Sequence, residues 1–589
     1  MSQNNSKNFI FLSFLFLILL INCFTSHSAK LKTFSALSAR ALKKAPPYPG
    51  KILSDSEARH HNKTQVMRSF GAGPSSREFS SINAKGSLKV IAVRCQFVEE
   101  NNNALITGNG RMVETKEKIN EHFTKFANYY KKASYGNLEL KVDISDKIYE
   151  AAQKMSYYGG SNESQDRVKS LVNDIFAVSE LNPSAGRSDI SNYIDYTKYN
   201  VIALVHAGYG QESDVAGGGS GNTSDDIWSI GFTDLGLNLT NSNKLNYAIV
   251  VPESEAQDGN IQNSPLGVIC HEFGHILGLP DLYDTDNSSF GAGAWDLMGY
   301  GAWRNSGNDP CMLSSWSLIS LGYLTAKEII VDSPSIEVKA LCDSPDALKL
   351  YASDKASNPG EYFLIENRAK KGLDSYIEGG GILIWHIDDG VGAIGLNNIN
   401  VNEKHKRVDL ESAEGYDSTG FDRFDYNKTG ALLMSDKDPF YSGYKSLFNA
   451  YSNPSSMPYN ANNAAVSVEV LSSPGDTMNV RASFYSIGSP GKSEISKAYF
   501  YPNPASGSEG KFYYYLNSIP DEVTLKIFDR SRKTLLRKEL FGKAGINEYI
   551  WNLTGDDYRQ VPNGTYFYKI TARTVSGESE KTGKICILK

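Results

Sequence analysis

One short helical segment with sharply defined ends, SPLGVICHEFGHILGLPD at residues 264–281, constrains the fold of this chain more than any other stretch. Ser264 is a good N-cap residue, and Pro265 suits the first helical position. At the other end, Gly278 can close the helix in the left-handed conformation, and Pro280 prevents the helix from resuming. The segment therefore predicts a short helix followed at once by a tight turn.

This helix carries two histidines four residues apart, His271 and His275. Both imidazoles then lie on one face, where they can bind one Zn²⁺ at ~2.0–2.1 Å. Glu272 is placed to take a proton from a zinc-bound water, whose pKa a catalytic zinc lowers towards ~7. The residues predict zinc-dependent hydrolysis of peptide bonds with Glu272 as general base. The alternative is an ordinary buried helix that contains two histidines.

A catalytic zinc needs a third protein ligand and an open fourth position. Asp281 follows His275 by six residues, where the metzincin pattern H-E-x-x-H-x-x-G-x-x-H has its third histidine. Aspartate is also a competent zinc ligand, so Asp281 is the predicted third ligand. Asp284, three residues further on, is the alternative.

The stretch WDLMGYG places Met298 in a glycine-flanked turn after the helix. In metzincins such a Met-turn forms a hydrophobic floor beneath the zinc. Tyr300 follows Met298 by two residues, as a tyrosine does in astacins and serralysins. We expect its phenol to steady the oxyanion during the reaction, the alternative being a tyrosine of the core.

Together these motifs resemble the immune inhibitor A family of secreted bacterial metalloproteases over residues 86–480. The resemblance implies a zinc-dependent endopeptidase made with a signal and a propeptide, acting on extracellular proteins or peptides. The pieces that carry it are KVIAVRCQF, FANYYKKASYGNLEL, VHAGYGQES, IWS, VVPE, HEFGHILGLPDLYD, GAWDLMGYGAW, EYFLIENRAKKGLDSYIEGGGILIWHIDD and VDLESAEG.

The local patterns predict the main secondary structure of this region. The nearly continuous apolar run LKVIAVRCQF from Leu88 is typical of a strand buried on both faces. Segment 114–132 has apolar residues at helical spacing, and a second helix is expected over about 311–322, starting at Asp309-Pro310. Residues 200–210 and 246–255 are expected to form further strands.

The predicted fold is multidomain: an α+β metzincin-like zinc protease domain, a mainly β domain and a C-terminal Ig-like β-sandwich. The first residues have one lysine, an apolar run and small residues up to Ala29, which is the layout of a secretory signal peptide. The predicted divisions are a signal peptide (1–29), a propeptide or flexible segment (30–85), the catalytic domain (86–325), a β-rich accessory domain (326–486), a linker (487–497) and a C-terminal domain (498–589).

The last domain, which opens with YPNP and closes with KTGKICILK, resembles the Ig-like domain of flagellar hook-capping proteins and the sorting domains of type IX secretion cargo. The resemblance implies a non-catalytic module for export or for attachment to the cell surface. The expected location is therefore extracellular, with partners in secretion machinery or at the cell surface, and no membrane span remains once the signal is removed.

Composition narrows the partners further. The net charge of −6 argues against nucleic acid as a partner. Two Asp-rich loops, DLYDTDNSSF and DSTGFDRFDYNKTG, are either solvated turns or sites for a structural Ca²⁺. His386 and Asp388 are read as structural. The remaining functional alternative is a catalytically idle protease fold that acts as a surface adhesion or binding protein.

Overall fold

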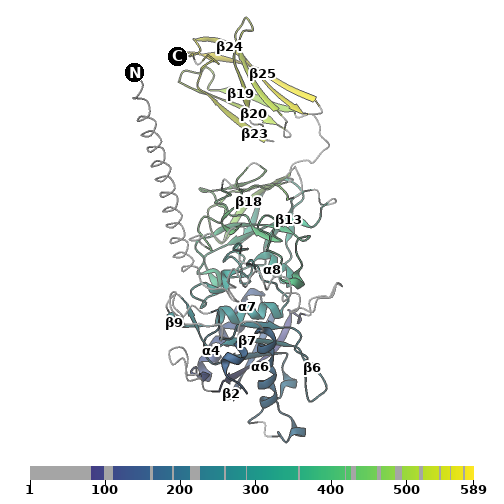
Figure 1. Ribbon diagram of the computed structural model, residues 1–589. Helices are drawn as coiled ribbons and strands as arrows, with labels where there is room; N and C mark the ends of the chain where they lie inside the picture. The colour runs from purple at the N-terminus through teal and green to yellow at the C-terminus, as the bar shows by residue number, and fades with distance from the viewer. Residues whose placement is uncertain are drawn as a thin grey trace, which may run out of the picture.

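The computed structural model (Figure 1) describes residues 81–98, 110–159, 164–188, 191–212, 226–257, 260–286, 288–353, 355, 358–417, 420–425, 433–450, 452–459, 466–484, 494–516, 520, 522–540, 542, 545–557, 559–574 and 577–589. The predicted signal peptide and most of the predicted propeptide lie outside these residues. Among the residues described, no helix combines the length and the apolar character needed to cross a membrane.

The first unit is built on a five-stranded sheet in the order β2-β1-β3-β7-β4. All neighbouring pairs are parallel except β7 and β4, which run antiparallel. Strands β2 and β4 form the two edges. The interior strand β1 is buried on both faces, as its apolar run predicts: Val90 packs into one core and Ile91 into the other. The strands are β1 Gly86–Gln96, β2 Leu138–Glu150, β3 Val201–His206, β4 Ile230–Phe232 and β7 Tyr247–Pro252.

Helices cover both faces of this sheet. On one face lie α4 (Lys116–Ala133) and α7 (Leu266–Ile276), which contact each other. The apolar stripe of α4 is buried there, as its spacing predicts. On the other face, α6 (Ser164–Ser179) buries Val168, Leu171, Val172 and Ile175. The shorter elements are α5 Met155–Gly159, η2 Pro183–Ala185, η3 Tyr196–Lys198, β5 Leu237–Asn238, β6 Lys244–Leu245, β8 Glu255–Gln257, β9 Asn260–Asn263, η4 Tyr300–Trp303 and α8 Ser315–Ser320.

The second unit has two sheets, in the orders β10-β12-β13-β14-β15 and β11-β18-β17-β16. Their pairs are antiparallel except for β10 and β12. The elements are β10 Lys327–Glu328, β11 Ser333–Lys339, β12 Ala347–Tyr351, β13 Glu361–Arg368, η5 Gly372–Asp374, β14 Gly381–Asp388, η6 Ile394–Leu396, β15 Val408–Leu410, η7 Arg423–Asp425, β16 Leu447–Phe448, β17 Val466–Val470 and β18 Thr477–Phe484.

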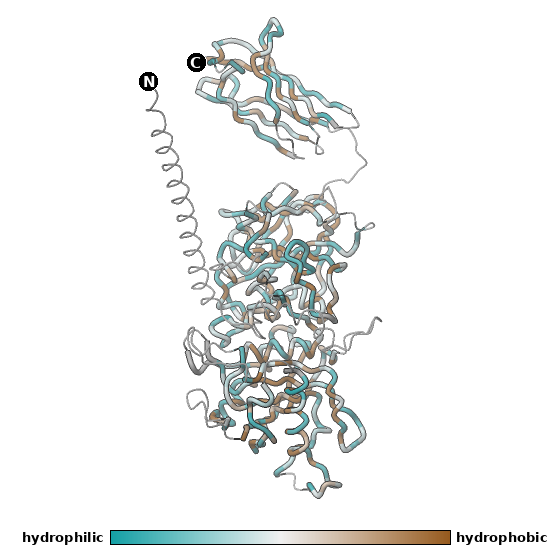
Figure 2. The backbone as a smooth tube through the Cα atoms, viewed as in Figure 1, coloured by the Kyte–Doolittle hydropathy of each residue, from teal (hydrophilic) through white to brown (hydrophobic). Residues whose placement is uncertain are grey.

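The larger of these sheets belongs to two cores at once. Successive side chains of β13 and β14 point to opposite faces. Phe363 and Ile384 face the second sheet, whereas Leu364 and Trp385 join the same apolar core as α4 and α7. The first and second units are therefore packed through one continuous core, which Figure 2 shows as hydrophobic segments running inside both.

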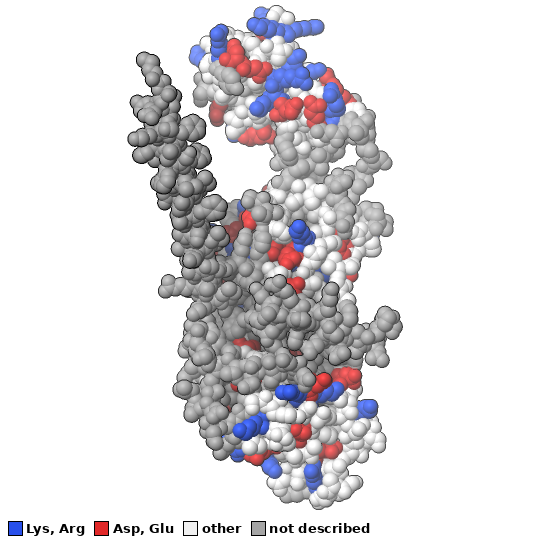
Figure 3. Space-filling model, in the orientation of Figure 1, with Lys and Arg blue, Asp and Glu red and all other residues white. Residues whose placement is uncertain are grey.

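The third unit has two antiparallel sheets, β19-β20-β23 and β22-β21-β24-β25, around a core of its own. Val523, Leu525 and Ile527 alternate into this core, as predicted from their spacing. Basic and acidic side chains intermix on the face of this unit seen in Figure 3. Its strands are β19 Ile495–Tyr501, β20 Gly510–Leu516, β21 Glu522–Phe528, β22 Thr534–Leu540, β23 Gly545–Trp551, β24 Gly564–Thr574 and β25 Gly577–Ile587.

Two helix starts differ from the prediction. Helix α7 begins at Leu266 with Pro265 as its N-cap, although the Ser264 hydroxyl still accepts from the Leu266 N–H at 3.3 Å. The helix expected over about 311–322 is shorter: α8 begins only at Ser315, with Ser314 as N-cap. In the described chain Cys95, Cys270, Cys311, Cys342 and Cys586 are free thiols.

Candidate metal centre

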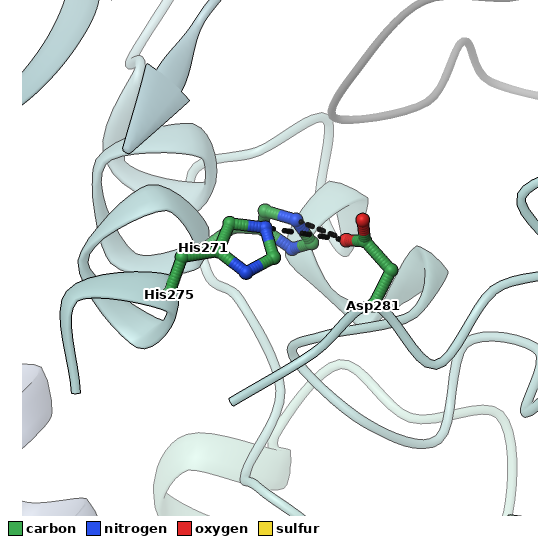
Figure 4. Close-up of side chains that lie close together, drawn as sticks. All are labelled: His271, His275 and Asp281. Atoms are coloured by element: carbon green, nitrogen blue, oxygen red, sulfur yellow. Dashed lines mark hydrogen bonds and ion pairs between the residues drawn. The ribbon is translucent and has the colours of Figure 1, made fainter. Parts of the chain in front are cut away.

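The histidines lie on α7, and the chain turns back just after it. Gly278 has φ +103°, and its N–H donates to the His275 carbonyl at 2.9 Å. The Leu279 N–H donates to the Gly274 carbonyl at 3.0 Å. This left-handed turn, which the sequence predicts at Gly278, brings Asp281 back towards the helix. Figure 4 shows the Asp281 carboxylate pointing at both imidazoles.

The three side chains converge on one point. Asp281 Oδ1 lies 3.0 Å from His271 Nε2 and 3.3 Å from His275 Nε2. Ligand atoms held by one tetrahedral Zn²⁺ at its usual bond lengths are ~3.3–3.4 Å apart. The two imidazoles and the carboxylate thus have the chemistry and nearly the spacing that zinc requires. Asp284 falls in a different acidic group, with Asp286 and Glu403.

The other ring nitrogens explain why a cation fits between these groups. His271 Nδ1 lies 3.0 Å from the Leu297 carbonyl oxygen, and His275 Nδ1 lies 2.8 Å from that of Leu279. Carbonyls only accept hydrogen bonds, so each Nδ1 carries the proton. In neutral imidazoles the Nε2 lone pairs then face the Asp281 carboxylate. A bound cation, or a second proton on each ring, is needed to make that arrangement favourable.

The electrostatics of the metal-free site have the same origin. Burial by itself raises the pKa of Asp281, but the two histidines outweigh burial and hold that pKa well below its usual range. Burial lowers the pKa of His275, but the neighbouring Asp281 carboxylate outweighs it and raises that pKa to about 9. The site is thus built to keep a negative carboxylate beside positive charge.

Glu272 is buried next to this site. Burial raises the pKa of its carboxyl, against the opposing effect of His275 and His271. Edge strand β4 lies directly against this part of α7, since a Cβ added to Gly231 would come within 2.8 Å of the Glu272 carbonyl oxygen. A carboxyl with a raised pKa is suited to accept and release a proton near neutral pH.

Glu212 is a second buried carboxyl that sequence reasoning missed. It accepts hydrogen bonds from the Ser229 hydroxyl and, at 3.3 Å, from the Ser229 N–H. Burial raises its pKa to about 7, and the charge of Glu272 adds to the rise. VHAGYGQES and IWS, two of the pieces that carry the family resemblance, meet in this contact. Neither of these two sequence segments by itself indicates a functional role for Glu212. The signal is the contact between them, which the sequence does not show.

Met298 packs against helix α7, which carries His271 and His275. A Cβ added to Gly274 would come within 2.4 Å of the Met298 sulfur. The turn is fixed by Asp296, which accepts from the Met298 N–H at 2.6 Å and from the Ser314 N–H at 2.6 Å. The Leu282 N–H donates to the Met298 carbonyl at 2.8 Å, so the Met-turn and the Asp281 loop are joined directly.

Tyr300 begins η4, and its side chain is buried. Its ring lies 5.9 Å from Phe290 and 6.3 Å from Tyr283. Tyr283 in turn stacks on His271, with centroids 6.1 Å apart and planes 18° apart. Sequence reasoning missed Tyr283, although it lies between the two candidate third ligands. The catalytic role expected for Tyr300 stays a prediction.

The remaining motifs have protein partners. His386 lies 3.0 Å from Glu361 Oε1 and 3.2 Å from Glu411 Oε1. In the second Asp-rich loop, buried Asp425 pairs with the Lys406 ammonium group. The choice between solvated turns and Ca²⁺ sites in the two Asp-rich loops stays a prediction.

An α/β domain whose buried helix brings two histidines and an aspartate to one point has the arrangement expected of a zinc metallopeptidase. Residues 95–320 match the family model of the immune inhibitor A peptidase M6 catalytic domain. The resemblance to that family predicted from the sequence is thereby confirmed for this part of the chain.

Two curated metalloproteases are similar in sequence to part of this chain. The chain is 29% identical over 223 residues to the pre-pro-metalloprotease PrtV of Vibrio cholerae, covering 33% of this chain and 23% of that protein. It is 31% identical over 155 residues to immune inhibitor A of Bacillus thuringiensis, covering 24% and 20% respectively. The chain thus spans less than a quarter of the length of either relative.

Among solved structures, truncated FlgD from Helicobacter pylori is 15% identical to this chain. The match covers 16% of this chain and 70% of that chain, with a TM-score of 0.13. That score is too low to support an argument about the fold.

Proposed function

We propose that this protein is a secreted zinc-dependent endopeptidase that hydrolyses peptide bonds of extracellular proteins. The observation that carries the proposal is the convergence of His271 Nε2, His275 Nε2 and Asp281 Oδ1, with both Nδ1 atoms hydrogen-bonded to carbonyls. These three residues would hold the ion. When bound, Zn²⁺ supplies Lewis acidity, which polarises a substrate carbonyl and acidifies a coordinated water.

Glu272 acts as the general base. It follows the ligand His271 on the same helix, and its buried carboxyl has a raised pKa. It takes a proton from the attacking water and passes that proton to the leaving amine as the peptide bond breaks. Burial, and to a smaller extent the charge of Asp281, raise the pKa of Glu272, so that its carboxyl can hold the proton between the two steps. Tyr300 is the proposed donor that steadies the oxyanion.

Edge strand β4 supports a peptide substrate over a small one. It pairs with β7 on one side and lies against α7 beside Glu272. An extended peptide can add to such an edge through backbone hydrogen bonds, which brings its scissile bond to the metal centre. This docking uses the backbone and leaves the cleavage preference to side-chain pockets.

The third unit is proposed to be an Ig-like module for export or surface attachment. Its two antiparallel sheets enclose a core separate from that of the other units. A module with its own core can be added without disturbing the metal centre. In this proposal the predicted signal peptide sends the chain out of the cell, and the predicted propeptide keeps it latent until removed.

The experiment compares zinc content and casein hydrolysis of wild type and Glu272→Gln after removal of the propeptide. We expect one zinc per chain in both and a loss of activity of about 10²–10⁴-fold in the variant. Two matched variants test the third ligand: Asp281→Asn should bind zinc more weakly than wild type, and Asp284→Asn should bind it as tightly as wild type.

The second candidate is a catalytically idle scaffold that binds at a surface, as the resemblance of the third unit to attachment modules suggests. Zinc in wild type and in Glu272→Gln, with no hydrolysis by either after propeptide removal, would favour the scaffold. No zinc in either would refute both the metal site and the enzyme.

A further inference from the structure

A loop of the second unit reaches the third metal ligand. The short helix η6 ends at Asn397, which adopts a left-handed conformation with φ 52° and ψ 38°. Its side-chain oxygen accepts from the Asp281 N–H at 2.7 Å, and its amide NH₂ donates to Asp281 Oδ2. Its backbone carbonyl accepts from the Thr285 hydroxyl at 3.2 Å. Asn397 thus holds the Asp281 loop at three points.

These contacts divide the Asp281 carboxylate between two partners. Oδ1 faces the two histidines, while Oδ2 is the acceptor for Asn397. The terminal torsion of an aspartate is broad, so a free carboxylate rotates between its two oxygens. The amide of Asn397 fixes that rotation and presents a single oxygen to the metal. Partners of this kind raise metal affinity by orienting the ligand.

We propose that Asn397 is a positioning residue for the metal ligand Asp281. The metal centre is then completed by a side chain from outside residues 95–320, the part that matches the catalytic-domain model. The inference rests on the proposed function, since it takes Asp281 as a zinc ligand. A second asparagine of the same segment, Asn400, donates to the Leu282 carbonyl at 3.0 Å and holds the loop in place.

The residue type fits this task. Asparagine offers one acceptor and one donor on a short side chain, so it can pair with the N–H and the carboxylate of the same residue. It also tolerates the left-handed backbone that the end of η6 requires. An aspartate at this position would keep the acceptor but turn the donor into a second negative charge against Oδ2.

The test measures zinc affinity of the full chain by competition with a chromophoric chelator, a readout independent of activity. Asn397→Gly removes the amide and keeps the left-handed backbone accessible. We expect its zinc dissociation constant to rise roughly 10- to 100-fold. The matched control is Asn398→Gly, because Asn398 accepts from the Ala393 N–H within the same loop. We expect zinc affinity in this control to stay within about twofold of wild type.

A double-mutant cycle separates positioning from a purely structural role. In the Asp281→Ala background, Asn397→Gly should have no further effect on the zinc dissociation constant, because the ligand it positions is gone. An equal loss in both backgrounds would overturn the proposal, and this comparison holds even if Asn397→Gly lowers the melting temperature. Unchanged affinity in Asn397→Gly, with wild type binding zinc and cleaving casein, would overturn the inference alone. No zinc in wild type would overturn the proposed function and the inference together.

Discussion

At the scale of residues, each predicted ligand of the candidate metal centre is oriented by a hydrogen-bond partner of its own, four, 26 or 116 residues away in the chain. The Leu297 carbonyl fixes His271, the Leu279 carbonyl fixes His275, and Asn397 fixes Asp281. The two carbonyl oxygens require a proton on each Nδ1, so in the neutral rings neither Nε2 carries a hydrogen. These hydrogen bonds favour a bound cation at the Nε2 atoms, although they do not contact the cation themselves.

His386 differs from His271 and His275 because a second proton on its own ring supplies the positive charge between two carboxylates. Both of its ring nitrogens face carboxylates, and its ring stacks on Tyr459 at 4.2 Å. Burial lowers the pKa of His386, but hydrogen bonds to Glu361 and Glu411 outweigh it and raise that pKa to about 9. Because the folded pKa exceeds the unfolded value of ~6.5, this site stabilises the fold fully below pH ~6.5.

That stabilisation is lost as the pH rises towards 9. The rise in the pKa of His386 corresponds to roughly 3 kcal/mol in the free energy of unfolding. We therefore predict that the melting temperature of metal-free protein falls between pH 7 and pH 9.5, and that it falls less in His386→Gln. Subtraction of the two pH profiles removes the parallel contribution of His275. An identical pH dependence in both proteins would contradict the assignment of an imidazolium at His386.

Local spacing in the sequence is enough to predict that the side chains of His271, His275 and Asp281 come together. Their convergence follows from the helical period and the turn at Gly278. Asn397, which is 116 residues from Asp281, has no local signal. Its partner is set by how the second unit packs on the first, and that packing is not encoded in a window of neighbouring residues.

At the scale of elements, a local cap decides where α8 begins. Ser314 has an extended backbone, with φ −67° and ψ 163°, and its hydroxyl accepts from the Ser317 N–H as the N-cap. The helix therefore starts at Ser315, although the proline at position 310 predicted an earlier start. The Met312 and Ser314 N–H groups, which precede the helix, donate to Asp374 at 3.0 Å and to Asp296 at 2.6 Å.

Close packing of α7 gives a prediction at the same scale. A Cβ at Gly267 would come within 2.0 Å of the Ala302 carbonyl oxygen, whereas at Gly274 the obstacle is the flexible end of Met298. Replacement of glycine by alanine favours a helix by about 1 kcal/mol at either position. The difference in melting temperature between the two variants therefore reports the clash of the added Cβ with its neighbours. We expect Gly267→Ala to lower the melting temperature of metal-free protein more than Gly274→Ala does. A melting temperature equal to wild type in Gly267→Ala would show that α7 and η4 are not packed this tightly.

At the scale of the whole molecule, the Met-turn is enclosed by the second unit. Fully buried Arg368 donates to the Trp295 carbonyl at 2.7 Å and pairs with Asp374. The Trp295 indole N–H donates to Asp438 at 2.9 Å. Removal of one partner from such a buried pair typically costs ~3–5 kcal/mol, so the second unit stabilises the Met-turn beneath the candidate metal centre.

The final prediction concerns where the functional unit ends. A chain cut after residue 325 would lose Asn397 and Arg368 and would expose the apolar face that packs against Leu364 and Trp385. A chain cut after residue 486 would keep them, because the core of the third unit draws only on residues from Ile495 onward. We expect fragment 86–486 to melt cooperatively and to bind one zinc, and fragment 86–325 to do neither. Calorimetry and zinc titration check this, with the full chain as reference. Cooperative melting and full zinc affinity in fragment 86–325 would mean that the catalytic domain is independent and that the shared core does not stabilise it.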